Sequence, residues 1–377
     1  MNITNILYLH ETSRIAGAEY SLLNLVKNID KTRFDPIFVL PEPGPLSEEL
    51  AKAGIEVLFI PFPKVRALAG VFRAFKKLAR VVKEKDIRII HSNSIRTHLY
   101  GSAAGREARV PVVWHERNLI ANELIDPERS LSFLPDRIIC NSGAIARRFM
   151  RRGALPAKVT VVHNGVDTGL FSPSVNGQKV REGFGVKADE TVVGIASRFH
   201  RSKGHETFFE AAKILLRDMP QRRLKFLVAG GAVFDTDKER EARLKDLAAV
   251  FPLNEAVVFT GLRKDMPEVY AATDLFVLAS DAEACGRVII EAMASGKPVV
   301  GTDSGGTPEI IEDGVSGILV APGKPKAMAE ALAMLINDRS KRTAMGLAGR
   351  KRAESLFSIG SNVRKIENIY AKLLEGR

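Results

Sequence analysis

The sequence has 377 residues, of which 45% are hydrophobic and 27% are charged, a composition typical of globular proteins. At about 150 residues per domain, this length predicts two domains. Two cysteines, Cys140 and Cys285, exclude a disulfide framework, and no Cys/His cluster indicates structural zinc. No apolar run is long enough to predict a membrane span, and the opening MNITNILYLH does not resemble a secretory signal. We therefore expect a cytoplasmic protein.

The formal net charge is +12 at pH 7, and the isoelectric point is near 9.7. A positive field of this size favours anionic partners such as nucleic acid, anionic lipid headgroups or phosphorylated substrates. Nucleic-acid-binding surfaces commonly interleave aromatic and basic residues. Aromatic residues make up only 7% of this chain and are mostly Phe in apolar contexts, so we expect no nucleic-acid partner.

The first half of the chain alternates short apolar runs with helical patterns. After ILYL come a loop around Gly17 and a helical pattern over residues 18–29. The strand-like runs are ILYL (6–9), PIFVLP (36–41), EVLFIP (56–61), RIIHSN (88–93), PVVWHE (111–116), RIICNS (137–142) and TVVHNG (160–165). Because their apolarity is continuous rather than alternating, they predict strands buried on both faces of a parallel sheet. The strand-then-helix order predicts a doubly wound α/β domain.

The pattern breaks after residue 163, where NGVDTGLFSPSVNGQ predicts a linker. Further strand-like runs follow: TVVGIAS (191–197), LKFLVAG (224–230), AVVFTG (256–261), LFVLAS (275–280), KPVVGT (297–302) and GILVAP (317–322). The sequence thus predicts two Rossmann-like domains, over 1–165 and 179–357, joined by a linker over 166–178.

The end of the chain, residues 358–377, has a helical apolar pattern. One face carries Val363, Ile366, Ile369, Tyr370 and Leu373, and we expect this amphipathic helix to pack back on the N-terminal domain. If the two domains face each other, the carboxyl ends of both sheets meet at one cleft, where ligands of open α/β sheets bind.

The densest group of candidate residues follows LFVLAS. A turn over 281–286 leads into a helix expected over 287–295. The backbone N–H groups from Gly286 to Val288 then form an anion site at the helix start. Glu283 in the turn and Glu291 inside the helix suit hydrogen bonds from sugar hydroxyls. Glu291 interrupts the apolar VIIEAMA, where an unpaired charge is costly, which argues against an ordinary exposed acid.

A second group carries positive charge. Arg198 and Lys203 follow the run TVVGIAS in the loop before the helical pattern HETFFEAAKIL. Two cations at the carboxyl end of one strand are suited to hold a diphosphate, Arg as a fork and Lys as a point charge. A solvated basic loop is the alternative interpretation.

Two weaker signals lie in the first domain. The first strand–helix turn contains Gly17 without a GxGxxG pattern, so a nicotinamide-dinucleotide fingerprint is absent. His115 ends the run PVVWHE, where it is a candidate base, hydrogen-bond donor or acceptor-site residue. His91 and His163 also close strand-like runs, and a lone histidine is more often structural.

Together and in this order, the segments resemble the retaining glycosyltransferases of family 4. The shared motifs are AGAEYSLLNL (16–25), VVHNGVD (161–167), the pair Arg198 and Lys203-Gly, EACGRVIIEAMASGKPVV (283–300) and GTDSGGTPEII (301–311). The resemblance runs from the first turn to about residue 357. It implies the GT-B architecture of two facing Rossmann-like domains, with acceptor binding in the first and donor binding in the second. The implied reaction is hexosyl transfer from a nucleotide sugar with retained anomeric configuration.

The resemblance also assigns roles by position in the donor domain. Arg198 and Lys203 would hold the donor diphosphate. Glu291 would take the ribose hydroxyls, and Glu283 would contact hydroxyls of the donor sugar.

Four further positions receive roles in the same way. Gly17 would let its loop approach the diphosphate, and Leu262 or Arg263 would meet the base through the backbone. His115 lies where some members place a histidine near the anomeric centre. No cofactor is implied, because the UDP- or GDP-linked sugar is a co-substrate, and no metal is required.

The sequence departs from the family pattern in three places. Cys285 and Arg287 replace an aromatic residue and a leucine, Ala16 replaces a glycine, and AVFDTDKERE replaces a short glycine-rich turn. These departures bear on donor identity. Arg287 is suited to pair with a carboxylate on the donor sugar or with its phosphates, and a surface salt bridge is the alternative.

Other interpretations compete with this one. Asp235-Thr-Asp237 matches an Asp-x-Asp metal motif, but acidic residues before KEREARLKDLA are better explained as helix caps. A GT-B nucleotide-sugar epimerase keeps the scaffold with another reaction, and a sugar phosphorylase would be a longer chain. A non-catalytic polyanion-binding protein explains the charge but not the placement of Glu283, Glu291, Arg198 and Lys203.

A basic segment suggests a peripheral location at the membrane. In VFRAFKKLARVVKEK (71–85) we expect Phe72, Phe75, Leu78, Ala79 and Val82 on one stripe and Arg73, Lys76, Lys77, Arg80 and Lys83 on another face. A second basic cluster is Arg147, Arg148, Arg151 and Arg152. Both lie in the domain expected to bind a glycan or lipid-linked acceptor, as in synthesis of cell-envelope polysaccharides. The alternative is that the apolar stripe simply packs on the sheet.

Overall fold

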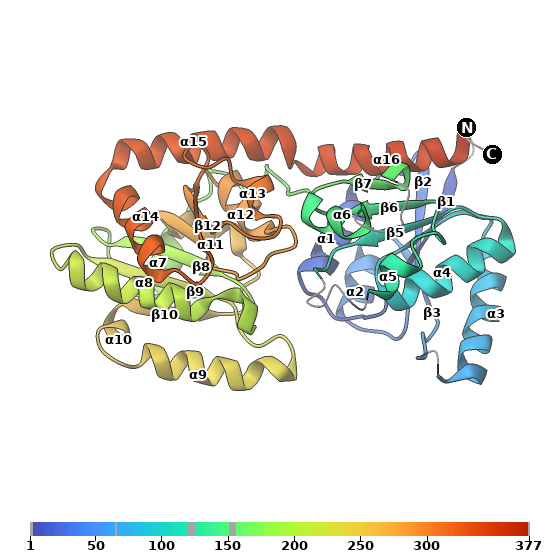
Figure 1. Ribbon diagram of the computed structural model, residues 1–377, viewed down its shortest axis with the longest axis horizontal. Helices are drawn as coiled ribbons and strands as arrows, with labels where there is room; N and C mark the ends of the chain where they lie inside the picture. The colour runs from blue at the N-terminus through green and yellow to red at the C-terminus, as the bar shows by residue number, and fades with distance from the viewer. Residues whose placement is uncertain (1–2, 65, 120–125, 151–155, 376–377) are drawn as a thin grey trace. The chain divides into compact units, whose positions relative to one another are not determined.

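The computed structural model describes residues 3–64, 66–119, 126–150 and 156–375. The chain divides into two compact units (Figure 1). Unit 1 is Met1–Gly165 with Ile359–Arg377, and unit 2 is Val166–Ser358. Each unit is an α/β fold built on its own sheet.

The described part of unit 1 contains a parallel sheet of seven strands in the order β3-β2-β1-β4-β5-β6-β7. Its strands are β1 Thr4–Leu9, β2 Phe34–Leu40, β3 Glu56–Phe59, β4 Ile87–Ser92, β5 Val112–Glu116, β6 Arg137–Cys140 and β7 Val159–Val161. All seven predicted runs are strands, because continuous apolar sequence suits strands that helices cover on both faces. The order reverses between β1 and β4, which makes that point the expected ligand-binding edge of the sheet.

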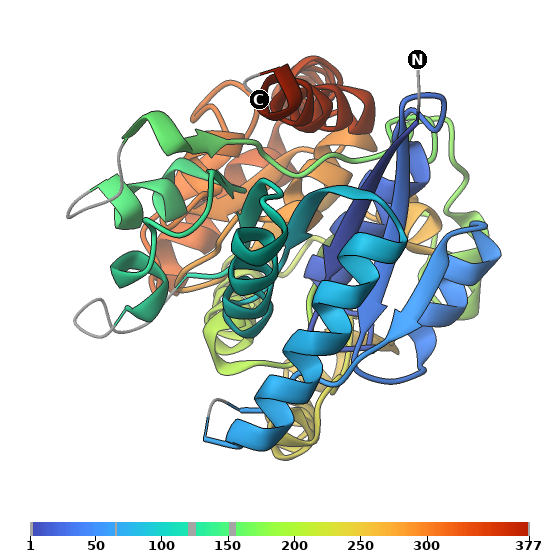
Figure 2. The same ribbon diagram turned by 90° about the vertical axis from the view of Figure 1, so that its right-hand side faces the viewer.

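Helices cover both faces of this sheet. They are α1 Gly17–Asn28, α2 Pro45–Lys52, α3 Leu68–Glu84, α4 Ile95–Ala108, α5 Pro127–Ser130, α6 Gly143–Met150, the short η1 Pro156–Lys158 and α16 Ile359–Glu375. Apolar side chains of α1, α2 and α16 share one core with the sheet. Helices α3 and α4 pack side by side on the sheet, as Figure 2 shows in blue and teal.

Unit 2 repeats the same topology. Its six-stranded parallel sheet has the order β10-β9-β8-β11-β12-β13 within the described residues. The strands are β8 Thr191–Ala196, β9 Leu224–Ala229, β10 Val257–Gly261, β11 Leu275–Leu278, β12 Val299–Thr302 and β13 Ile318–Val320. They too coincide with the predicted runs, and here the order reverses between β8 and β11. The predicted α/β fold class with two parallel sheets is thus confirmed.

Two apolar cores flank the sheet of unit 2. Helices α8, α9, α10 and α14 contribute to one core, and α11, α12, α13 and the end of α15 contribute to the other. The helices of this unit are α7 Gln178–Gly183, η2 Arg201–Lys203, α8 His205–Asp218, η3 Asp235–Asp237, α9 Lys238–Ala248, α10 Leu253–Ala256, α11 Met266–Ala272, α12 Arg287–Ala294, α13 Thr307–Ile310, α14 Pro325–Asn337 and α15 Arg339–Leu356.

The last helix, α16, belongs to unit 1 although unit 2 precedes it in sequence. Val363, Ile366, Ile369 and Tyr370 of the predicted apolar face are buried in the core of unit 1. Polar contacts hold the helix as well, since Asn362 Nδ2 donates to the carbonyl of His163 (2.6 Å) and Glu367 Oε1 accepts from the N–H of Asp30 (2.7 Å). The chain therefore crosses back to complete its first unit.

The predicted apolar stripe on α3 is partly wrong. Ala74, Leu78 and Val82 are buried, whereas the Phe72 side chain is 57% exposed and has the Lys76 ammonium 4.5 Å from its ring centroid. Helix α3 packs against α4 and β4, and its buried residues follow the i, i+4 row through Ala74, so Phe72 remains on the outer surface with the basic residues.

The second predicted basic cluster also needs correction. Arg147 is exposed, but Arg148 is buried, where acidic partners described below neutralise it. Arg151 and Arg152 lie outside the described residues.

Candidate active site

The loop after β8 carries both predicted cations of unit 2. The guanidinium of Arg198 lies 5.2 Å from the centroid of the Phe234 ring, and its Nη1 is 3.8 Å from Asp237 Oδ2. About a third of the Arg198 side chain, 35%, is exposed. The loop after β9, which departs from the family pattern in sequence, therefore supports Arg198 through stacking and charge while leaving part of the guanidinium accessible.

Lys203 and Glu283 form an ion pair across the point where the strand order reverses. Lys203 Nζ lies 2.6 Å from Glu283 Oε2, and Ser280 Oγ donates to the same oxygen at 3.3 Å. One residue follows β8 and the other follows β11, which are neighbouring strands. Two residues that the sequence predicted separately thus meet at the edge where open α/β sheets generally bind ligands.

Backbone contacts fix the loop that holds Glu283. The carbonyl of Glu283 accepts from the N–H of Gly306 (2.7 Å), and the N–H of Asp281 donates to the carbonyl of Ser202 (2.9 Å). Gly204 has φ +66°, and a Cβ there would lie 1.9 Å from the carbonyl oxygen of Ala279. Only glycine fits this close approach of the two loops.

Helix α12 begins directly after this loop. Gly286 precedes it with φ +51°, a left-handed conformation that favours glycine, and Arg287 and Val288 form its first turn. By helix geometry, the first backbone N–H groups have no acceptor inside the helix and present partial positive charge. Cys285, which stands where the family commonly has an aromatic residue, is buried in a core of unit 2.

Glu291 is buried inside α12 and is paired. Tyr270 Oη donates to Glu291 Oε2 at 2.7 Å, and Arg287 Nη1 lies 3.3 Å from Glu291 Oε1. Burial, reinforced by the carboxylate of Glu291, raises the pKa of Tyr270 well above its usual range. The carboxylate is therefore held by one neutral donor and one cation, and Arg287 makes an ion pair within its own helix.

The two predicted base-binding residues lie after β10. Leu262 is 65% exposed and packs beside Gly231. The Arg263 side chain turns to Asp265, with Nε donating to Oδ1 at 2.8 Å. An exposed leucine next to a glycine leaves an apolar surface at the carboxyl edge of the sheet.

In unit 1, the turn between β1 and α1 is tied by its own side chains. Glu19 Oε1 lies 2.8 Å from His10 Nε2, and Glu19 Oε2 accepts from the N–H of Ala16 at 2.9 Å. Burial alone would raise the pKa of Glu19, but the hydrogen bond and charge of His10 bring it below its usual value. Gly17 is exposed, and a Cβ there would meet open space.

His115 is buried near the end of β5, with 1% of its surface exposed. Its Nδ1 lies 3.1 Å from His91 Nε2 and 3.1 Å from Arg117 Nη2. Its Nε2 has no hydrogen-bond partner among the described residues. Burial, together with the charge of Arg117, lowers the pKa of His115 well below its usual range, which favours the neutral imidazole.

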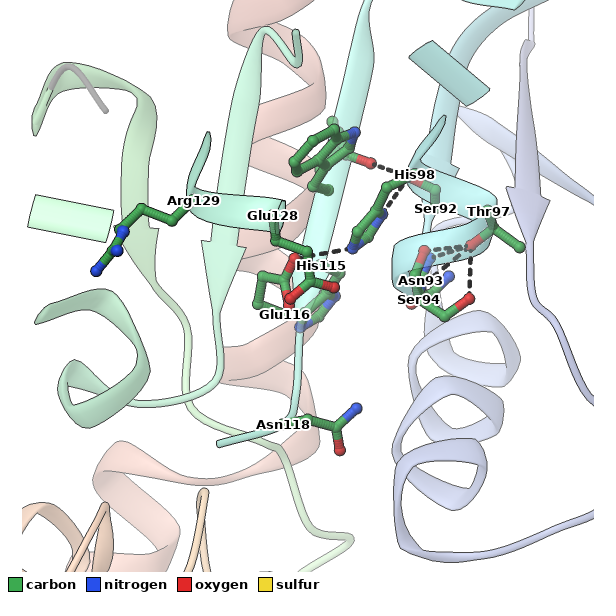
Figure 3. Close-up of polar contacts among 12 residues, drawn as sticks. Ser92, Asn93, Ser94, Thr97, His98, His115, Glu116, Asn118, Glu128 and Arg129 are labelled. Carbon is green, nitrogen blue, oxygen red and sulfur yellow. Dashed lines mark hydrogen bonds and ion pairs between the residues drawn. The ribbon is translucent and has the colours of Figure 1, made fainter. Parts of the chain in front are cut away.

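A buried ion-pair cluster that sequence reasoning missed lies beside His115 (Figure 3). His98 Nε2 is 2.9 Å from Glu116 Oε1 and its Nδ1 contacts Ser92 Oγ at 2.8 Å. Arg148 Nε donates to Asp126 Oδ2 at 2.5 Å, and its Nη2 donates to Glu128. The residues come from β4, α4, β5, α5 with its N-cap, and α6, so no local sequence pattern connects them.

This cluster also contains the group in the described residues whose ligand atoms could surround a metal ion, His98, Glu116 and Glu128. Arg148 and His98 already contact these carboxylates. We therefore interpret the group as an ion-pair network that fastens α4, α5 and α6 to β5.

The Asp-x-Asp segment has local partners. Asp237 Oδ2 accepts from the N–H of Phe234 at 3.2 Å, and Asp235 Oδ1 lies 2.9 Å from Lys238 Nζ. Asp237 thus caps η3 and also faces Arg198.

The cluster predicts a pH-dependent stability. Burial, with repulsion from Glu116, raises the pKa of Glu128 from 4.5 to about 7. A raised folded-state pKa means that the contribution of Glu128 is fully present below pH 4.5 and is lost as pH rises through 7. The loss should reach about 3 kcal/mol of unfolding free energy. In Glu128→Gln, the fall in stability of unit 1 between pH 5 and 8 should shrink by that amount.

Urea unfolding at both pH values measures this difference, with the exposed Glu48→Gln as control. Equal pH dependence in the wild type and Glu128→Gln would contradict the assignment.

Two family models match the chain. One, described as glycosyl transferases group 1, matches residues 177–352, and the other, described as glycosyltransferase family 4, matches residues 15–170. D-inositol 3-phosphate glycosyltransferase 1 of Catenulispora acidiphila is 30% identical over 312 residues, covering 77% of this chain and 73% of that protein. The lipopolysaccharide core biosynthesis mannosyltransferase LpsB of Rhizobium meliloti is 31% identical over 241 residues, covering 63% and 66%.

The chain spans only about half the length of some curated relatives, such as 53% of one from Corynebacterium kroppenstedtii. A crystal structure of HepE from Anabaena in complex with UDP-glucose is similar over almost the whole chain. It has a TM-score of 0.85 and 27% identity, covering 98% of this chain and 99% of that one.

Proposed function

The chain belongs to glycosyltransferase family 4, the group 1 glycosyl transferases, and on that premise we propose that it moves a hexosyl group from a nucleoside diphosphate sugar to a glycan or lipid-linked acceptor. The observation that carries the proposal is the Lys203–Glu283 pair at the strand-order reversal of unit 2. The pair places the Lys203 ammonium, which can bind a phosphate, beside the Glu283 carboxylate, which can accept hydrogen bonds from sugar hydroxyls. The similarity to HepE, which was solved with UDP-glucose, supports a nucleotide-sugar donor, and we propose that it is UDP- or GDP-linked.

The leaving nucleoside diphosphate gains negative charge as the glycosidic bond breaks. Arg198, Lys203 and the N–H groups at the start of α12 stabilise that charge without a metal ion or another cofactor. An ammonium has three donors, so Lys203 can hold Glu283 and a phosphate oxygen at once. The acceptor hydroxyl attacks from the face that the phosphate leaves, its proton passes to the leaving phosphate oxygen, and the anomeric configuration is retained.

The remaining site residues bind the rest of the donor. Glu283 accepts from hydroxyls of the donor sugar, and Glu291 accepts from the ribose. Leu262 and Arg263 meet the base through their backbone. Because Arg287 faces Glu291 at 3.3 Å, it has a structural partner before any donor binds.

A thermal-shift screen tests the donor class. A ligand that binds only the folded state at about 100 times its Kd stabilises it by about 2.7 kcal/mol, which raises Tm by several degrees. We expect such a rise with a UDP- or GDP-sugar, and a smaller one in Lys203→Ala. No rise with UDP-, GDP- or ADP-sugars would overturn the proposal.

Single substitutions test the two cations. Arg198→Ala and Lys203→Ala should each lower turnover about a hundredfold, as the loss of a donor to a developing anion does. Arg201→Ala is the matched control, because Arg201 lies in the same loop and is exposed. Turnover is measured as nucleoside diphosphate release. Full activity in the variant that combines Arg198→Ala with Lys203→Ala would refute the role of the two cations. Activity that EDTA abolishes and manganese restores would refute the metal-free assignment.

The same proposal places the enzyme at an anionic membrane surface, attached through α3. Within the described residues, every helix is too short or too polar to span a bilayer, so attachment would be peripheral. The exposed Phe72 stands among exposed Arg73, Lys76, Lys77, Arg80 and Lys83. Each basic residue at an anionic surface contributes about 1 kcal/mol, and Phe72 adds shallow insertion.

Vesicle sedimentation tests this attachment. Binding should grow with phosphatidylglycerol content, fall at high salt, and disappear when Arg73, Lys76, Lys77 and Arg80 become Glu. A control with the same change in net charge replaces the exposed Lys324, Lys326, Lys341 and Lys351 of unit 2 by Glu and should bind normally. An equal loss of vesicle binding in both variants, or binding that does not depend on the content of anionic lipid, would contradict this attachment and favour a soluble acceptor.

A further inference from the structure

A continuous row of buried polar rings runs through unit 1. Tyr8 Oη lies 2.8 Å from Tyr370 Oη, which lies 2.5 Å from His91 Nδ1. His91 Nε2 in turn lies 3.1 Å from His115 Nδ1. Each of these four side chains is at most 1% exposed. The row ends at the histidine proposed for the active site.

The row joins parts of the chain that are far apart in sequence. Tyr8 is on β1, and the register of the sheet places it beside His91 on β4. His115 is on the next strand, β5, whereas Tyr370 comes from α16, 279 residues after His91. The ring of Tyr370 meets that of His91 edge-on, with centroids 5.9 Å apart. The hydroxyl that contacts His91 is therefore supplied by the returning C-terminal helix.

One cation fixes the direction of each hydrogen bond in the row. Arg117 is only a donor and its Nη2 faces His115 Nδ1, so this nitrogen must carry the lone pair. His91 Nε2 faces the same lone pair and must therefore carry a proton. His91 Nδ1 is then an acceptor, and it receives the proton of the Tyr370 hydroxyl. Tyr370 oxygen in turn accepts from Tyr8.

Resting on the proposed function, we propose that Tyr370 is a positioning residue for the transfer reaction. It acts through His91 to hold His115 as the tautomer that bears its proton on Nε2. His115 Nε2–H is buried and has no hydrogen-bond partner among the described residues, so within them it is a donor without an acceptor. It serves as a neutral hydrogen-bond donor to an oxygen of the substrate and not as a base.

Two further observations support a neutral row. Burial and the charge of Arg117 lower the pKa values of both His91 and His115 well below the usual range. Burial also raises the pKa values of Tyr8 and Tyr370. The charged or titratable groups that face the row are Arg117, whose Nη1 donates to Asn164, Glu367 on α16, and His98 on α4. Each of these shifts favours the neutral form of the ring.

The tautomer is measured by nitrogen NMR of the 15N-histidine-labelled full chain, without turnover. The chain has seven histidines, and His91→Gln and His115→Gln assign the two signals. We expect both rings as the Nε2–H tautomer, with no titration from pH 6 to 8. Tyr370→Phe should shift both signals. Tyr100→Phe, the control, removes another buried hydroxyl of unit 1, which donates to the Pro63 carbonyl, and should leave them in place.

The positioning role is measured as kcat/KM for UDP release from UDP-glucose. Tyr370→Phe and His91→Leu should lower it about tenfold, by analogy with outer-shell partners of metal-bound histidines. His91→Gln should recover part of the loss, because its amide offers a donor to His115 and an acceptor to Tyr370. Tyr100→Phe should leave kcat/KM unchanged even where it lowers Tm.

The outcomes separate the two claims. A wild type that releases no UDP would overturn the proposed use of UDP-glucose, while the NMR result would still decide the tautomer. Equal kcat/KM in Tyr370→Phe and Tyr100→Phe, or a His115 signal of the Nδ1–H tautomer, would overturn the positioning role and leave the proposed transferase function standing.

Discussion

A polar side chain at the end of a buried parallel strand loses much of its contact with water. Its burial costs free energy unless a neighbouring strand or loop supplies a hydrogen-bond or ion-pair partner. Both units contain such pairings. Lys203 forms an ion pair with Glu283 between the loops after β8 and β11, and His115 on β5 contacts His91 on β4. Because parallel strands end at the same edge, residues far apart in sequence become neighbours there. The candidate site is largely the set of these pairings.

The same constraint explains why backbone geometry matters so much in unit 2. The loop of Glu283 can approach the loop of Lys203 only because Gly204 has no Cβ to strike the carbonyl of Ala279. Backbone hydrogen bonds from Asp281 and to Glu283 then fix that approach. A phosphate-binding edge needs its donors positioned before the ligand arrives, since donors that need no reorganisation stabilise developing charge best.

Sequence patterns predicted every strand of both sheets, because a strand covered by helices must be apolar throughout and that requirement is local. They also placed Arg198, Lys203, Glu283 and Glu291 on the correct loops and helices. They did not predict that Phe72 is exposed. Helical periodicity predicts which face of a helix is apolar, but it does not predict how many residues of that face are buried. They missed Tyr370 and Arg148 as polar partners, because a pairing between distant elements leaves no periodic signal.

The candidate site residues of the two units differ in charge, and the proposed reaction explains the difference. The leaving diphosphate becomes more negative, so cations that keep their charge, Arg198 and Lys203, suit unit 2. The anomeric carbon becomes more positive as its bond to phosphate breaks, so an imidazolium near it would raise the barrier. Burial and Arg117 favour the neutral form of His115, and in the proposed row from Tyr370 its one proton lies on Nε2. A histidine held in this way can bind an oxygen of the sugar without opposing the charge that develops beside it.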